Sequence, residues 1–111
     1  MSKLSDEVKR VILEVFPFYR LIEEHYIVYM KQKLFFDFYL PELLLAIEAQ
    51  GVQHDKFVQH FHKDTMGFYK HKSRDKKKVT WAKENNINLI EIRPSDLPLN
   101  ASKFFAIVYE D

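Results

Sequence analysis

The spacing of hydrophobic positions predicts a helix followed by a strand at the start of the chain. Between residues 4 and 16, apolar side chains recur at the three- and four-residue intervals of an amphipathic helix, and Pro17 ends this pattern. Residues 19–30 are rich in β-prone residues but alternate poorly, so we expect one strand there, straight or bent.

Two further segments, residues 33–40 and 43–50, have the strongest strand character in the chain. Pro41 and Glu42 lie between them and predict a tight turn, because proline fixes a backbone angle that such turns require. The two segments are therefore expected to pair as an antiparallel hairpin.

The second half of the chain returns to helical periodicity. In order, we expect an irregular stretch, a helix, a strand and a short helix over residues 55–67, 68–84, 87–93 and 101–109. The pair Asn85–Asn86 tolerates the left-handed conformation that ends a helix. In the last helix, Phe104, Phe105 and Val108 are expected to face inward. The resulting order, α-β-β-β-α-β-α, predicts a single α/β domain over residues 1–111, with a mixed sheet flanked by helices.

Composition narrows the class of protein. Apolar residues make up 47% of the 111 positions and charged residues 30%, which is typical of a folded globular domain. The absence of cysteine excludes disulfides and thiolate zinc sites. No apolar run has the length of a membrane span, and the first residues lack the hydrophobic core of a signal peptide. We therefore expect a cytoplasmic protein that has no membrane partner.

The net charge is only +1, but the positive charges are unevenly distributed. The segment KHKSRDKKK, residues 70–78, is dominated by lysine and arginine and holds a single acid. The residues expected to contact a phosphate backbone are Lys70, Lys72, Arg74, Lys76 and Lys77. An ordinary solvated helix face would have the same composition, so charge alone leaves both interpretations open.

Two acids, Asp37 and Glu48, stand in the segments expected to form core strands, where an unpaired carboxylate is costly to bury. Pairing around the predicted turn sets Asp37 opposite Ala46. The same register sets Glu48 opposite Phe35, so the two acids share one face as diagonal neighbours. Two carboxylates that converge in this way form a site for a hard divalent cation such as Mg²⁺. In the alternative interpretation, they are strand-end acids that point to solvent or pair with a lysine such as Lys33.

Three motifs follow one another along the chain: DFYLPELLLAIEAQGVQH (residues 37–54), RDKKK (74–78) and ENNINLIEI (84–92). They resemble the PD-(D/E)XK nuclease superfamily, which has the restriction-endonuclease-like fold. More narrowly, they resemble the small nucleases related to very-short-patch repair endonucleases and to phage homing endonucleases of that type. The resemblance covers about residues 5–93, and the first motif is its most specific part.

The resemblance implies a magnesium site formed by Asp37, Glu48 and the backbone carbonyl of Ala49, in which Mn²⁺ would substitute for Mg²⁺. It also implies a further acid on the first helix, for which Glu7 is the first choice and Glu14 the rival. The implied fold is a restriction-endonuclease-like α-β-β-β-α-β core, and the implied activity is hydrolysis of phosphodiester bonds in DNA.

One position departs from the superfamily pattern. The lysine that usually follows the second acid by two residues is Gln50 here. A glutamine can orient the attacking water by hydrogen bonding, but it supplies no positive charge. The resemblance places Lys78 where it could supply that charge, with Arg74 in the same motif, and it makes His54 a candidate general base. The alternative for His54 is an ordinary loop histidine.

The sequence thus predicts a metal-dependent DNA endonuclease related to phages or mobile elements, which would act in the host cytoplasm if phage-encoded. A monomer would nick one strand and a homodimer would cut two, and a separate domain or protein for DNA recognition is compatible with both. The competing prediction is a non-catalytic nucleic-acid-binding module with the same fold, and a structural interaction protein is a third. An RNA nuclease or a junction resolvase would have the same site, since no base-reading element is recognisable.

Overall fold

The computed structural model describes residues 3–49 and 65–109, with side chains from residue 73 onward in the second range. Its elements, in chain order, are α1 (Lys3–Val15), β1 (Ile22–Tyr29), β2 (Gln32–Leu40), β3 (Leu45–Ala49), α2 (Thr65–Glu84), β4 (Asn88–Ile92) and α3 (Ala101–Tyr109). Two short 3-10 turns, η1 (Pro41–Leu43) and η3 (Pro94–Asp96), follow β2 and β4. The predicted order of helices and strands is therefore confirmed in the described part of the chain.

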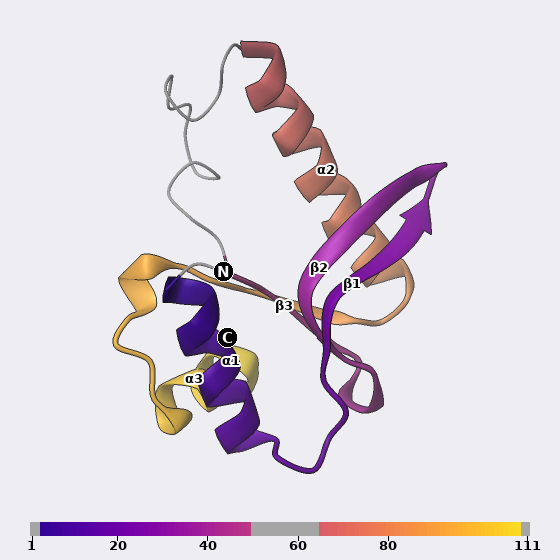
Figure 1. Ribbon diagram of the computed structural model, residues 1–111. Helices are drawn as coiled ribbons and strands as arrows, with labels where there is room; N and C mark the ends of the chain where they lie inside the picture. The colour runs from indigo at the N-terminus through magenta and orange to yellow at the C-terminus, as the bar shows by residue number, and fades with distance from the viewer. Residues whose placement is uncertain (1–2, 50–64, 110–111) are drawn as a thin grey trace.

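The four strands form one mixed sheet in the order β1-β2-β3-β4. The first three strands pair antiparallel, whereas β3 and β4 run parallel. A parallel pair needs a crossover connection, and α2 lies in the chain between β3 and β4. Figure 1 shows α1 and α3 side by side, and the β1–β2 hairpin projecting next to α2. This is the predicted α/β architecture, a mixed sheet flanked by helices.

One face of the sheet is covered by α1 and α3. The fully buried residues of α1 are Val8, Val11 and Ile12, which recur at the helical spacing that the sequence predicts. They belong to the same apolar cluster as Phe38 of β2 and Ile47 of β3. This cluster is the main core of the protein.

The last helix adds to this core with one face only. Phe104 and Val108, one helical turn apart, are buried as predicted. Phe105 is 49% exposed, so the prediction that it faces inward is wrong. The reason is geometric, because each residue turns the helix by about 100° and Phe105 therefore leaves the face that Phe104 occupies.

The opposite face packs against α2 and has a smaller apolar cluster. Ala82 of α2 belongs to this cluster together with Phe36, Ala46 and Ile87. The Trp81 ring packs on the Phe36 ring, with 5.4 Å between centroids. These contacts attach the C-terminal half of α2 to the sheet, and they set the position of the preceding turns of the helix.

The pairing of β2 with β3 differs by two residues from the predicted register. Ala46 faces Tyr39 rather than Asp37. The cause is the turn, in which η1 is followed by Leu44 in the left-handed conformation, with a φ of 50°. The turn between the paired strands therefore has four residues, 41–44, whereas the predicted turn had two, Pro41 and Glu42.

The shift changes the partner of each acid but not its face, because side chains on a strand alternate with a period of two. The printed pairing of the two strands ends with Phe38 and Ile47, the residues next to Asp37 and Glu48. The predicted register, which sets Asp37 opposite Ala46 and Glu48 opposite Phe35, is therefore wrong.

The boundaries of the second half lie close to the predicted ones. The helix α2 begins at Thr65 instead of residue 68, and Asn86, just past its end, has the expected left-handed conformation with a φ of 56°. The strand β4 falls within the predicted residues 87–93. Among the helices that the structure describes, none combines the length and hydropathy needed to cross a membrane.

Candidate active site

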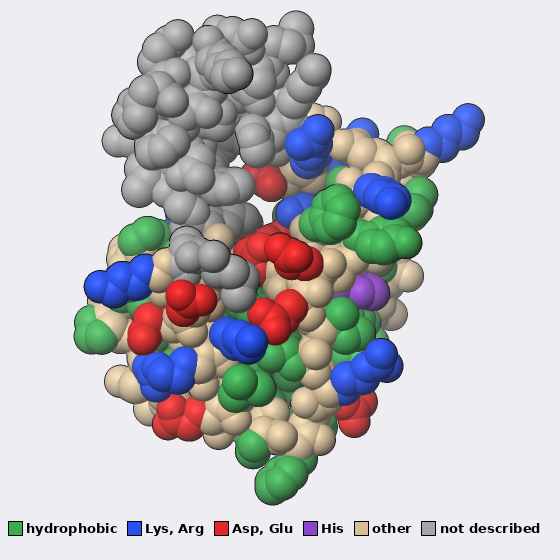
Figure 2. Space-filling view, viewed as in Figure 1, with side chains coloured by type: hydrophobic (Ala, Val, Ile, Leu, Met, Phe, Trp, Pro, Cys, Tyr) green, Lys and Arg blue, Asp and Glu red, His purple; other side chains and the backbone are tan. Residues whose placement is uncertain are grey.

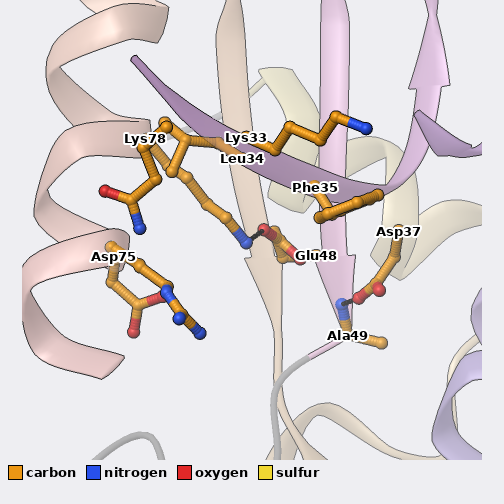
Figure 3. A pocket seen from close by; sticks show the side chains of 10 residues that line it. Lys33, Leu34, Phe35, Asp37, Glu48, Ala49, Asp75 and Lys78 are labelled. Carbon is orange, nitrogen blue, oxygen red and sulfur yellow. Dashed lines mark hydrogen bonds and ion pairs between the residues drawn. The ribbon is translucent and has the colours of Figure 1, made fainter. Parts of the chain in front are cut away.

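A pocket of about 450 Å³ opens between the sheet and α2. On the face shown in Figure 2, acidic side chains gather near the middle of the molecule with basic ones around them. Asp37 of β2 and Glu48 of β3 both line the pocket, and α2 contributes Arg74, Asp75 and Lys78 (Figure 3). The two acids of the first motif and the basic segment of α2 therefore meet in one place.

Glu48 is the buried acid of this pocket, with only 6% of its surface exposed. It lies on β3, which has a strand on each side, and the Lys78 ammonium donates a hydrogen bond to its Oε1 over 2.5 Å. Burial is the main cause that raises the pKa of Glu48 to about 7; Lys78 opposes the rise, and the carboxylate of Asp37 adds to it. Near neutral pH this carboxyl therefore keeps a proton part of the time.

Asp37 is held in place by the neighbouring strand. Its Oδ2 accepts a hydrogen bond from the backbone N–H of Ala49 over 2.8 Å. This bond draws the carboxylate to the end of β3, next to Glu48. In Figure 3 the Glu48 carboxylate lies between Lys78 on one side and Asp37 on the other.

Lys78 reaches Glu48 from the middle of α2. Its side chain is 17% exposed, and its ammonium lies 5.5 Å from the centroid of the Phe36 ring. Arg74 is four residues earlier on the same helix face, lines the same pocket and is exposed. The helix thus presents one half-buried cation inside the pocket, Lys78, and one exposed cation at its border, Arg74.

The donor set of the pocket fits a hard divalent cation. Asp37 and Glu48 bring carboxylate oxygens from adjacent strands, and Ala49 lines the same pocket. The raised pKa of Glu48 is the sign of a buried carboxylate whose charge Lys78 does not fully balance. Among the side chains that the structure describes, in residues 3–49 and 73–109, no cluster of three or more His, Cys, Asp and Glu is suited to a metal. Mg²⁺ typically takes one or two carboxylates and keeps several waters, so the pair Asp37 and Glu48 supplies the carboxylates that such an ion needs.

Neither of the two helix acids considered from the sequence lines this pocket. Glu7 and Glu14 both accept hydrogen bonds from Arg10, over 3.0 Å and 3.3 Å. The hydrogen bond from Arg10 lowers the pKa of Glu7. Glu7 instead lines a separate cavity of about 310 Å³ together with Lys3 and Pro98.

The basic residues of α2 have different surroundings. Arg74 and Lys76 are exposed. Lys77 is half-buried and donates a hydrogen bond to Oε1 of Gln32 over 2.7 Å. It therefore connects the helix to the β1–β2 hairpin, a contact that the charge pattern of the sequence does not predict.

Other predicted site residues fall outside the part of the chain that the structure describes. They are Gln50 and His54, together with the side chains of Lys70 and Lys72. Their roles rest on the sequence and on the resemblance alone.

The site predicted from the sequence does not include four hairpin residues that line the pocket: Gln32, Lys33, Leu34 and Phe35. Phe35 could have been predicted from the sequence, because strand alternation sets it on the same face as Asp37. Gln32 and Leu34 take part because the hairpin runs along α2, and strand periodicity carries no information about that packing.

No protein-family model matches the chain, and no solved structure matches it. Over 56 residues, the chain is 43% identical to Uncharacterized protein 307L of Invertebrate iridescent virus 6. The matched segment covers 50% of this chain and 28% of the viral protein, so the chain spans little more than a quarter of that relative's length. The name of the viral protein assigns it no activity, and the functional argument therefore rests on the geometry of the site.

Proposed function

We propose that the protein is a metal-dependent DNA endonuclease of the PD-(D/E)XK superfamily, with a restriction-endonuclease-like fold. One observation carries the proposal: Asp37 and Glu48, from adjacent strands, line one pocket into which Lys78 places its ammonium. Carboxylates from neighbouring strands together with a lysine form the combination needed to bind a cation and a phosphate oxygen at the same point.

The topology supports the same proposal. The core order of α1, three strands, α2 and β4 matches the α-β-β-β-α-β core implied by the resemblance. The acids lie on the central strands β2 and β3, and α2 crosses over between the parallel pair.

Asp37, Glu48 and the backbone carbonyl of Ala49 would hold Mg²⁺, or Mn²⁺ in its place. When bound, the ion would supply a Lewis acid for the scissile phosphate and lower the pKa of a coordinated water. Within the chain, the hydrogen bond from the Ala49 N–H already orients the Asp37 carboxylate, and Lys78 favours the ionised form of Glu48.

Lys78 has a second role in this proposal. Gln50 stands where the superfamily usually has a lysine, so positive charge for the transition state has to come from elsewhere in the site. The Lys78 ammonium is already inside the pocket, and Arg74 is at its border. Both side chains would neutralise charge on the phosphate, while Gln50 orients the attacking water and His54 accepts its proton.

DNA would lie along the exposed side of α2. Arg74 and Lys76 are exposed there, and Lys70 and Lys72 belong to the same helix. Contacts of this type hold the phosphate backbone without reading its sequence. The chain would act as a monomer that nicks or as a homodimer that cuts both strands.

The test is nicking of supercoiled plasmid with and without Mg²⁺. Asp37→Asn and Glu48→Gln are expected to reduce the nicking rate by about a hundredfold or more, because each removes a charged ligand. Binding of DNA should stay within about tenfold of wild type, since phosphate contacts on α2 supply most of the affinity. An unchanged nicking rate in either variant overturns the proposal.

The matched control is Glu91→Gln. Glu91 lies on β4 at the level of Glu48, is half-buried, and accepts a hydrogen bond from Arg93 over 3.1 Å. It does not line the pocket. This variant should nick at the wild-type rate, which separates loss of a site residue from loss of a carboxylate in the sheet.

A second candidate function is a non-catalytic nucleic-acid-binding module with the same fold. The observation that favours it is that both acids have partners inside the protein, Ala49 for Asp37 and Lys78 for Glu48. The plasmid assay separates the two candidates, because a binding module shifts the DNA at every Mg²⁺ concentration without nicking it.

A further inference from the structure

The β1–β2 hairpin exposes two aromatic rings next to each other. Tyr26 and Phe35 pair across the two strands, with ring centroids 5.9 Å apart, and are 50% and 52% exposed. Val28 and Met30, farther along the hairpin, are 63% and 71% exposed. Large apolar side chains that stay grouped on a projecting hairpin mark a surface that binds a partner.

Positive charge accompanies these rings. The Lys33 ammonium lies 4.6 Å from the centroid of the Tyr26 ring, and Lys31 is exposed in the turn at the tip. Figure 2 shows hydrophobic side chains between basic ones on the part of the molecule where the hairpin projects in Figure 1. Exposed aromatic faces beside cations are the combination that stacks bases and holds phosphates in single-strand binding proteins. An apolar peptide, the other kind of partner for exposed rings, has no negative charges to pair with these lysines.

The rings are also continuous with the candidate active site. Phe35 and Lys33 line the same pocket as Asp37 and Glu48. A nucleic-acid strand with a phosphate in the pocket would therefore meet the aromatic surface within the next nucleotides. Lys77, which bonds Gln32, ties the hairpin to α2 and keeps this surface next to the pocket.

We propose that Tyr26, Lys33 and Phe35, called here the hairpin platform, stack an unpaired base of the nucleic acid next to the phosphate in the pocket. The inference rests on the proposed function and narrows its substrate class to single-stranded or locally unpaired DNA. A base inside a duplex is stacked on both sides, whereas an unpaired base has a face available for an aromatic ring.

The chain contains a matched control for this platform. Phe105 and Tyr109 of α3 form a second exposed Phe–Tyr pair, 49% and 52% exposed, with ring centroids 4.8 Å apart. Neither residue lines the pocket. Replacing this pair with alanine removes the same two kinds of ring, with nearly the same exposure, from a site away from the pocket. We expect this change to leave the affinity for nucleic acid unaltered.

The experiment measures binding by fluorescence anisotropy in EDTA, which prevents cleavage, with labelled single-stranded and duplex DNA of about 15 nucleotides per strand. The double variant Tyr26→Ala/Phe35→Ala is expected to weaken single-strand binding by about 10- to 100-fold. Duplex binding should change by less than about threefold, since phosphate contacts dominate it. Phe105→Ala/Tyr109→Ala should leave both affinities within about twofold. The single variant Phe35→Trp, which keeps an aromatic ring, should bind single-stranded DNA about as well as wild type, whereas Phe35→Ala should bind it more weakly.

Two further readouts separate stacking from a structural or oligomeric effect. The dependence of affinity on salt should keep its slope in the double variant, because no phosphate contact is removed, and the melting temperature should stay unchanged. Equal losses in both double variants, or none in the platform variant, overturn the inference. So does a wild-type dimer that the platform variant abolishes while single-strand affinity stays the same, because a second copy then covers the surface.

Failure of this inference is distinguishable from failure of the proposed function. A wild-type protein that nicks plasmid with Mg²⁺, together with a platform variant of unchanged affinity, overturns the platform alone. A wild-type protein that never nicks, together with a platform variant that loses single-strand affinity, overturns the endonuclease and leaves the platform as part of a binding module.

Discussion

The two faces of the central sheet differ in the polarity of their side chains. The face under α1 and α3 is a continuous apolar cluster in which Ile12, Ile47 and Phe104 are fully buried. The face under α2 has a smaller apolar cluster around Phe36, and next to it lies Glu48, the only buried charged side chain in the described residues. The first face stabilises the fold, whereas the second combines a modest core with a charged pocket.

The strand β3 shows this division within two consecutive residues. Ile47 points into the main core and Glu48 into the pocket, because adjacent residues on a strand face opposite sides of the sheet. Substitutions on the first face should therefore change the stability of the protein. Substitutions on the second should change cation binding, cleavage and the response to pH.

The largest stability effect is expected on the apolar face. Phe38→Ala removes a fully buried ring and should lower the free energy of unfolding by about 3–5 kcal/mol, because a cavity remains. Urea denaturation followed by circular dichroism measures this change. Phe18→Ala, at a position that is 93% exposed, is the control and should change stability by less than about 0.5 kcal/mol. A similar loss in both variants would contradict the assignment of the core.

The next effect tests the charged face through pH. The pKa of Glu48 is about 7 in the folded protein and near 4.5 when unfolded, so between these values the folded state binds more protons. The free energy of unfolding should therefore fall as pH rises from about 4.5 to 7, by about 3 kcal/mol in total. Glu48→Gln should abolish this fall and be more stable than wild type at pH 8.

The control for the pH series is again Glu91→Gln, which removes a carboxylate from β4 at the same level. It should retain the pH dependence of the wild-type protein. If Glu48→Gln and wild type show parallel stability curves between pH 4 and pH 8, burial of Glu48 does not control the response, and the contrast between the two faces is weaker than the structure indicates.

A smaller effect is expected from the cation itself. At pH 8, Mg²⁺ at ten times its dissociation constant should raise the free energy of unfolding by about 1.4 kcal/mol, since the ion binds the folded state alone. Thermal melts at constant ionic strength measure this gain, and EDTA should reverse it. Asp37→Asn and Glu48→Gln should lose the gain, whereas Phe18→Ala should keep it. Equal gains in all four proteins would show that Mg²⁺ binds elsewhere.

Sequence periodicity predicts the elements well because hydrophobic spacing reports directly on which face of each element is buried. It predicts the helix at Val8, Val11 and Ile12, and it sets Asp37 and Glu48 on one face. The register of β2 and β3 depends instead on the conformation of the turn, which the pattern does not encode. A single left-handed residue at Leu44 moves the pairing by two positions.

The candidate site shows a similar limit. The resemblance points to Lys78, but its hydrogen bond to Glu48 depends on how α2 packs across the sheet, since thirty positions separate the two residues. The same packing brings Gln32 and Leu34 into the pocket. Contacts between elements distant in sequence are set by the tertiary fold, and hydrophobic spacing within one element carries little information about them.

The smallest effect on cleavage is expected at the first helix. The resemblance makes Glu7 the first choice for the helix acid of the site, whereas in the structure Glu7 pairs with Arg10 and lines a different cavity. Glu7→Gln should therefore slow plasmid nicking by less than about tenfold, against a hundredfold or more for Glu48→Gln. Glu14→Gln is the matched control, because it also pairs with Arg10 and is exposed. A loss in Glu7→Gln as large as that in Glu48→Gln, with Glu14→Gln unchanged, would mean that Glu7 leaves Arg10 when DNA and metal bind. The helix α1 would then contribute apolar residues to the main core and, from its N-terminal turns, an acid to the active site. The division between a stabilising face and a catalytic face of the sheet would not hold for that helix.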